Sequence, residues 1–174
     1  MQVGVVGLLL WKLLLAIDKE VTRLLIENGA DVNLQTKSGR TALMIISRDR
    51  YLDYTDIVKL LIENGADVNT RDKDGWTALM FASGLLHYYP NHIEIVRLLV
   101  ESGADVNARN NDNQTALMVA SHSYYDAHIE MAEIMIENGV DVNAKSNNGA
   151  SSLSIALFYG NINMVNLLQE NGAI

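Results

Sequence analysis

The sequence contains no cysteine, and its 174 residues include only one proline, two tryptophans and two phenylalanines. Without cysteine the chain forms no disulfide and offers no thiolate to a metal, which is typical of a reducing compartment. Basic residues are also scarce, because 13 Lys and Arg stand against 21 Asp and Glu, for a net charge of −8. Binding to phosphates requires a clustered excess of positive charge. We therefore expect a cytoplasmic protein whose partner is not a nucleic acid.

Long apolar runs are absent apart from the stretch Val5 to Ile17, which Lys12 interrupts. A membrane-spanning helix needs about 20 apolar residues. A secretory signal begins with basic residues, and none precedes Lys12. We therefore expect no membrane segment. This apolar stretch either folds back on the rest of the protein or is covered by another molecule, and the sequence leaves both possibilities open.

Motifs of known catalytic chemistry are lacking as well. The chain has no phosphate-binding loop, no G-x-S-x-G and no H-E-x-x-H. Its four histidines form two pairs whose spacings match no single face of a helix, which argues against a metal site. These are His87 with His92 and His122 with His128. The carboxylates are spread along the chain rather than paired for acid–base work. We predict a protein that is not an enzyme and that uses no cofactor or metal.

One stretch of sequence recurs along the whole chain. Residues 60–69 read LLIENGADVN, with near-copies at 24–33, 98–107 and 134–143 and a shortened copy at 167–174. The glycines that mark the copies are separated by 36, 38, 36 and 33 residues. They are Gly29, Gly65, Gly103, Gly139 and Gly172. A period of this length is typical of a repeat array.

A second motif recurs between these copies. It reads GRTALM at residues 39–44, GWTALM at 75–80, NQTALM at 113–118 and, more weakly, GASSLS at 149–154. The threonine is placed to cap a first helix. The LLIEN stretch belongs to a second helix with a broad apolar stripe that ends at the glycine. Because one helix pair cannot cover its own stripe, the pairs must stack on one another.

Together the two motifs resemble the ankyrin repeat, whose signature is G-x-T-P-L-H, then alanines, then a Leu-rich helix ending in G-A-D-V-N. The resemblance covers essentially the whole chain, but Ala replaces the Pro, and Met44, Met80 and Met118 replace the His. We expect these methionines in the core. The resemblance implies an all-α solenoid of helix-turn-helix repeats with β-hairpin fingers. We predict five repeats in a single domain, 1–174, with lengthened inter-helix loops in repeats two to four. The expected repeats are 1–34 (an N-terminal cap), 35–70, 71–108, 109–144 and 145–174 (a C-terminal cap).

The resemblance also implies a function, which is protein binding through the finger tips and the exposed side of the first helices. Trp76 is the foremost anchor candidate, because an exposed indole in a turn is costly unless a partner covers it. Alternatively, it packs against Arg40 or Arg109 as a cation–π pair. The positions carried over are Lys37, Ser38, Arg40, Arg48, Arg71, Lys73, Asp74, Trp76, Arg109, Asn111, Asp112, Gln114, Lys145 and Asn147.

A second candidate surface comes from the residues inserted between the two helices of repeats two to four. These inserts hold six of the seven tyrosines and all four histidines, and stacking of the repeats would align them as a ridge. Tyrosine is common at binding surfaces. The alternative is that the rings stack on one another between repeats. The tyrosines are Tyr51, Tyr54, Tyr88, Tyr89, Tyr124, Tyr125 and Tyr159.

Two other functions remain open at this point. The chain is either a scaffold that self-associates through its apolar N-terminal segment or a regulatory domain of a larger protein. We expect a monomer that binds a protein partner, with a homodimer through residues 1–15 as the alternative.

Overall fold

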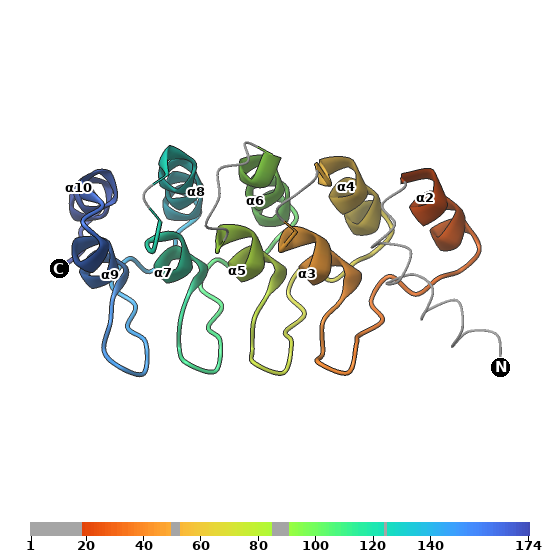
Figure 1. Cartoon of the computed structure of the whole chain (residues 1–174), viewed down its shortest axis with the longest axis horizontal. Helices are drawn as coiled ribbons and strands as arrows, with labels where there is room; N and C mark the ends of the chain where they lie inside the picture. Colours follow the sequence, from red (N-terminus) through yellow and green to blue (C-terminus); the bar gives the residue numbers. More distant parts are fainter. Residues whose placement is uncertain (1–18, 50–52, 85–90, 124) are drawn as a thin grey trace.

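The computed structural model describes residues 19–49, 53–84, 91–123 and 125–174. Within these ranges the chain is helical and has no strand. The helices, labelled as in Figure 1, are α2 (Lys19–Glu27), α3 (Ala42–Ser47), α4 (Thr55–Glu63), α5 (Ala78–Ser83), α6 (Asn91–Glu101), α7 (Ala116–Ala120), α8 (Asp126–Glu137), α9 (Ser152–Tyr159) and α10 (Ile162–Glu170). The apolar stretch Val5 to Ile17 lies outside the described residues.

The helices form two parallel rows. The short helices α3, α5, α7 and α9 make an inner row, and α2, α4, α6, α8 and α10 make an outer row (Figure 1). Each helix contacts the next member of its own row, α3 with α5 and α4 with α6, for example. The loops that join one pair to the next all project to the same side (Figure 1). The predicted helical solenoid is therefore confirmed.

The predicted caps of the inner helices are confirmed. The hydroxyls of Thr41, Thr77 and Thr115 accept hydrogen bonds from the backbone N–H three residues ahead, at 3.4, 3.4 and 3.3 Å. Ser151 does the same for α9 within a capping box. A left-handed glycine ends each outer helix that carries the LLIEN motif, as at Gly65 with φ of 84°. The local sequence thus sets where each helix begins and ends.

The core runs along the interface between the two rows. Met44, Met80 and Met118 are fully buried there, as expected. A thioether fills irregular space but donates no hydrogen bond, so these positions contribute packing alone. Hydrogen bonds between repeats are therefore formed at other positions in the chain.

One such connection is made by the asparagine of each Asp-Val-Asn segment. The amide of Asn33 donates to the Gly65 carbonyl at 2.8 Å, and its oxygen accepts the Asp67 backbone N–H at 2.8 Å. Asn69, Asn107 and Asn143 form the same pair of bonds with the next repeat. Successive repeats are thereby held in one register.

One buried position recurs near the start of each outer helix from α4 onward. It is occupied by Tyr54, His92, His128 and Asn161, and at His92 and Asn161 it forms a second kind of connection. His92 donates from Nε2 to the Asp49 carbonyl at 2.8 Å, and the Asn161 amide donates to the Ser123 carbonyl. Both bonds reach back to the inter-helix loop of the preceding repeat. The expected ridge is thus wrong for Tyr54, His92 and His128, because these side chains point into the stack.

Candidate functional site

Four finger loops join successive helix pairs, at residues 34–41, 70–77, 108–115 and 144–151. Each closes on a tight turn, which in the second loop joins the Asp72 N–H to the Trp76 carbonyl at 3.0 Å. The Asp72 carboxylate also accepts the backbone N–H groups of Asp74 and Trp76, each at 2.9 Å. Thr36, Asn110 and Ser146 occupy the same position in the other loops. The turns are therefore fixed by side chains within each loop.

Neighbouring finger loops are joined to one another through their backbones. Lys73 N–H donates to the Ser38 carbonyl at 3.0 Å, and Asn111 N–H donates to the Asp74 carbonyl at 3.0 Å. Asn147 N–H continues the series to Asp112 at 2.9 Å. The four tips form one continuous edge. The described residues hold these paired turns without strands, so the expected β-hairpins are not confirmed.

The structure brings the residues carried over from the family onto this edge and onto the adjoining inner face, which is the exposed side of the row formed by α3, α5, α7 and α9. Half-buried side chains are those of Arg40, Trp76, Arg109 and Gln114. Exposed side chains are those of Lys37, Ser38, Arg48, Arg71, Lys73, Asp74, Asn111, Asp112, Lys145 and Asn147. None is fully buried, so all of them remain available for contact.

Several of these residues also hold the loops together. The side-chain amides of Asn111 and Asn147 donate to the Lys73 and Asn111 carbonyls, at 2.9 and 3.0 Å. The Arg71 guanidinium donates to the Arg109 carbonyl, and Arg109 in turn donates to the Lys145 carbonyl at 3.3 Å. Arg109 additionally lies 3.7 Å from the Asp141 carboxylate. Substituting either arginine would disturb the loop backbone as well as the surface charge. Binding experiments therefore need other residues as probes.

Trp76 is not the free exposed indole that the sequence suggests. It is half-buried, and its ring stacks on Phe81 with centroids 5.1 Å apart. The guanidinium carbons of Arg40 and Arg48 lie 5.1 and 6.0 Å from the Phe81 centroid. Cation–π contact thus forms on Phe81, the ring on which Trp76 stacks. The sequence reasoning missed Phe81, whose only signal is its place just after Met80.

A cavity of about 320 Å³ opens on the inner face between the last two finger loops and helices α7 and α9. The His122 and Tyr159 ring centroids lie 5.3 Å apart, and those of Phe158 and Tyr159 lie 5.2 Å apart. The Phe158 side chain is 83% exposed. None of the residues that line the cavity is Lys, Arg, Asp or Glu. They are Gln114, His122, Ser146, Asn148, Ala150, Ser154, Ile155, Phe158 and Tyr159. The cavity joins Gln114 of the first candidate set to Tyr159 of the second.

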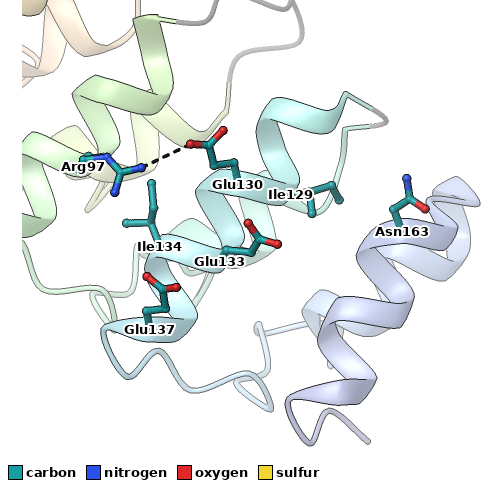
Figure 2. Close-up of a pocket in the computed structure, with 7 residues that line it drawn as sticks. All are labelled: Arg97, Ile129, Glu130, Glu133, Ile134, Glu137 and Asn163. Atoms are coloured by element: carbon teal, nitrogen blue, oxygen red, sulfur yellow. Dashed lines mark hydrogen bonds and ion pairs between the residues drawn. The ribbon is translucent and has the colours of Figure 1, made fainter.

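A second hollow, of about 470 Å³, lies on the outer face over α6, α8 and α10 (Figure 2). Glu130, Glu133 and Glu137 line it from one face of α8, and Arg97 lies 3.4 Å from Glu130 (Figure 2). None of the candidate binding residues lines this hollow. The two faces of the stack therefore differ in character, since the outer one is acidic here and the inner cavity is uncharged.

The tyrosine surface is only partly described. Tyr54 is buried at 2% exposure, Tyr125 is exposed, and Tyr159 is half-buried against His122. Burial and the nearby Asp49 carboxylate raise the pKa of Tyr54 to about 12. The remaining tyrosines, Tyr51, Tyr88, Tyr89 and Tyr124, lie outside the described residues. A continuous tyrosine ridge stays a prediction.

The described part of the chain lacks two further features. There, no three His, Asp or Glu side chains gather where they could hold a metal ion. In the same residues, every helix is too short or too polar to cross a membrane.

Comparison with known proteins agrees with the geometry. The family model described as ankyrin repeats (3 copies) matches residues 13–110 and 86–174. The chain belongs to the ankyrin repeat family. A comparison with curated proteins finds no match. Ankyrin repeats are generally protein–protein interaction modules, and the family is typically non-catalytic.

Proposed function

We propose that this chain is a non-catalytic module of five ankyrin repeats that binds a cytoplasmic protein. Its contact surface consists of the tips of the four finger loops, acting as hairpin fingers, together with the exposed sides of α3, α5, α7 and α9. The observation that carries this proposal is the set of backbone hydrogen bonds between neighbouring loops, which fixes the tips side by side.

A fixed edge favours binding for a physical reason. Association costs the freedom of every loop and side chain that must be ordered, and a surface that is already ordered avoids most of this cost. The paired hydrogen bonds of the Asp-Val-Asn asparagines and the backbone bonds between loops provide that order. A partner therefore meets a preformed surface of four successive tips.

The chemistry of the surface changes along the stack. The first two finger loops present four basic side chains, Lys37, Arg40, Arg71 and Lys73. The last two present two, Arg109 and Lys145, among amides such as Asn111 and Asn147, and Asp74 and Asp112 add one exposed carboxylate to each half. Complementary charge chiefly steers association and selects the partner. We expect the partner to carry acidic groups, most of them opposite the first two loops.

Affinity capture followed by quantitative mass spectrometry tests the proposal. The informative variant is K37A/K73A, because no hydrogen bond or ion pair is recorded for either side chain in the structure. The matched control is K59A, an exposed lysine on the outer face. We expect K37A/K73A to lose a polypeptide that the wild type and K59A both retain. Equal retention by all three proteins would contradict the proposed surface.

Light scattering tests the alternative of self-assembly. Residues 1–15, through which the alternative homodimer would form, lie outside the described residues. Our proposal predicts the mass of a 19.2 kDa monomer at all concentrations. A concentration-dependent dimer that disappears on deletion of residues 1–12 would favour the scaffold function instead.

A further inference from the structure

The spaces between consecutive repeats on the inner face are built from equivalent positions. Thr41 and Thr115 cap equivalent helices and lie 74 positions apart. Subtracting 74 from the number of each residue that lines the inner cavity therefore gives the equivalent residue between the second and third repeats. Gln114 thus corresponds to Arg40 and His122 to Arg48, while Ala150, Ser154 and Ile155 correspond to Trp76, Met80 and Phe81.

In the earlier pair of repeats this space is filled by the chain itself. Trp76 stacks on Phe81 at 5.1 Å, Met80 is buried beneath them, and Arg40 lies over the Phe81 ring. Arg40 is held in place by an ion pair to Asp72 at 3.1 Å. The filling is therefore aromatic, with cationic side chains above it.

In the last pair of repeats three of these positions hold smaller side chains, whereas Phe158 replaces Gly84. Alanine replaces the tryptophan, serine replaces the methionine, and isoleucine replaces the phenylalanine, at positions 150, 154 and 155. The backbone spacing is preserved, because Asn147 N–H still donates to Asp112, at 2.9 Å. The lost side-chain volume thus remains as the cavity of about 320 Å³, which is within the size range of ligand pockets.

The walls of the cavity suit a ring. His122, Phe158 and Tyr159 offer ring faces and edges, which attract another aromatic group in offset or edge-to-face geometry. Because the Met118 carbonyl can only accept, His122 donates to it from Nδ1, at 2.9 Å. Such a pocket disfavours an unpaired charge, since no Lys, Arg, Asp or Glu lines it.

We infer that this pocket accepts an aromatic side chain, an indole or a phenyl ring, from the bound partner protein. The inserted ring takes the place that Trp76 and Phe81 occupy between the second and third repeats. This inference rests on the proposed function, since the ring arrives as part of a protein held by the finger loops. Aromatic anchors inserted in pockets contribute much of the energy of protein interfaces.

Titration with N-acetyl-tryptophanamide, followed by NMR, tests the pocket without the partner. We expect saturable shifts at Ala150, Ile155 and His122, with smaller shifts for N-acetyl-leucinamide and none for N-acetyl-lysinamide. Equal responses to all three probes, or shifts that avoid these residues, would overturn the inference.

Ala150→Trp closes the pocket with the residue that the chain itself uses at the equivalent position. We expect it to abolish the saturable shifts of Ile155 and His122. Gln169→Trp is the matched control, because it adds an indole at an exposed position of α10 in the outer row. If A150W does not fold, as judged by circular dichroism, Ser154→Met fills the cavity from below. Unchanged binding of the probe in a folded, filled variant would refute the pocket.

Capture of the partner separates this inference from the function on which it rests. If K37A/K73A loses the partner and A150W retains it fully, the surface is right and the aromatic anchor is wrong. Loss in both variants, with retention by Q169W, supports both proposals. If all variants retain the partner, the proposed surface fails and the pocket is not its anchor, even where the amide probe binds.

Discussion

The side-chain amide of Asn69 donates to the Gly103 carbonyl across 2.9 Å and so joins the end of one repeat to the end of the next. The amide oxygen of Asn69 accepts the Asp105 backbone N–H at 2.7 Å. The two bonds form a bracket that only an amide provides, because one group must both donate and accept. The bracket recurs along the stack and explains how the fold keeps its spacing without the family's histidine.

Replacing Asn69 with alanine should therefore weaken the coupling between repeats. A typical hydrogen bond contributes about 0.5–1.5 kcal/mol, so the loss of two should cost about 1–3 kcal/mol in the free energy of unfolding. Urea denaturation followed by circular dichroism measures this. Asn64→Ala is the control, since Asn64 forms only a bond within its own helix end, to the Leu60 carbonyl at 2.8 Å. A loss at Asn69 no larger than that at Asn64 would rule out the bracket as a coupling element.

The cap of α7 gives a second prediction. Thr115→Ala removes the hydroxyl that accepts the Met118 N–H at 3.3 Å. Loss of such a cap costs about 0.5–2 kcal/mol. We expect a lower unfolding midpoint in urea, and Thr115→Ser should retain more of the stability because serine caps α9 in the same way. Equal destabilisation by the two substitutions would show that the hydroxyl contributes little.

The phenol of Tyr54 should ionise at a higher pH than an ordinary tyrosine. Burial and the Asp49 carboxylate raise its pKa to about 12 from a usual value of 10.0. The folded state thus favours the neutral phenol. Its contribution to stability is complete below pH 10 and is lost as the pH rises through about 12.

Stopped-flow absorbance at 295 nm after a pH jump records this ionisation before the chain unfolds. The difference between the wild type and Tyr54→Phe should show one tyrosine titrating near pH 12. Asp49→Asn should shift that titration to lower pH. A difference curve centred near pH 10 would show that the Tyr54 hydroxyl is solvated.

The sequence predicts those features that depend on short-range pattern. The caps at Thr41, Thr77 and Thr115 and the buried methionines follow from positions within a single repeat. The burial of Tyr54 and His92 could not be predicted in this way, because it depends on where the preceding inter-helix loop lies. Trp76 was misplaced for a different reason, because its partner Phe81 belongs to the next element, α5, and no helical or strand period relates the two positions.

The inner cavity was missed for a related reason. The sequence shows that Ala150 and Ser154 are small. Small side chains leave a cavity, however, only if the backbones of the neighbouring repeats keep their spacing. That spacing is maintained by bonds between finger loops, such as Asn147 to Asp112. Comparison of the repeats position by position, from Trp76 to Ala150, would have signalled the missing volume.

Site-specific photo-crosslinking in cells that make this protein tests the central claim most directly. A photoreactive residue is placed at Lys37 or Lys145 on the finger loops, and at Glu63 or Glu101 on the outer helices, all of which are exposed. We predict that one and the same protein crosslinks to both finger-loop positions and to neither outer position. Crosslinking of that protein from the outer helices, with none from the finger loops, would contradict the proposal that this edge binds the partner.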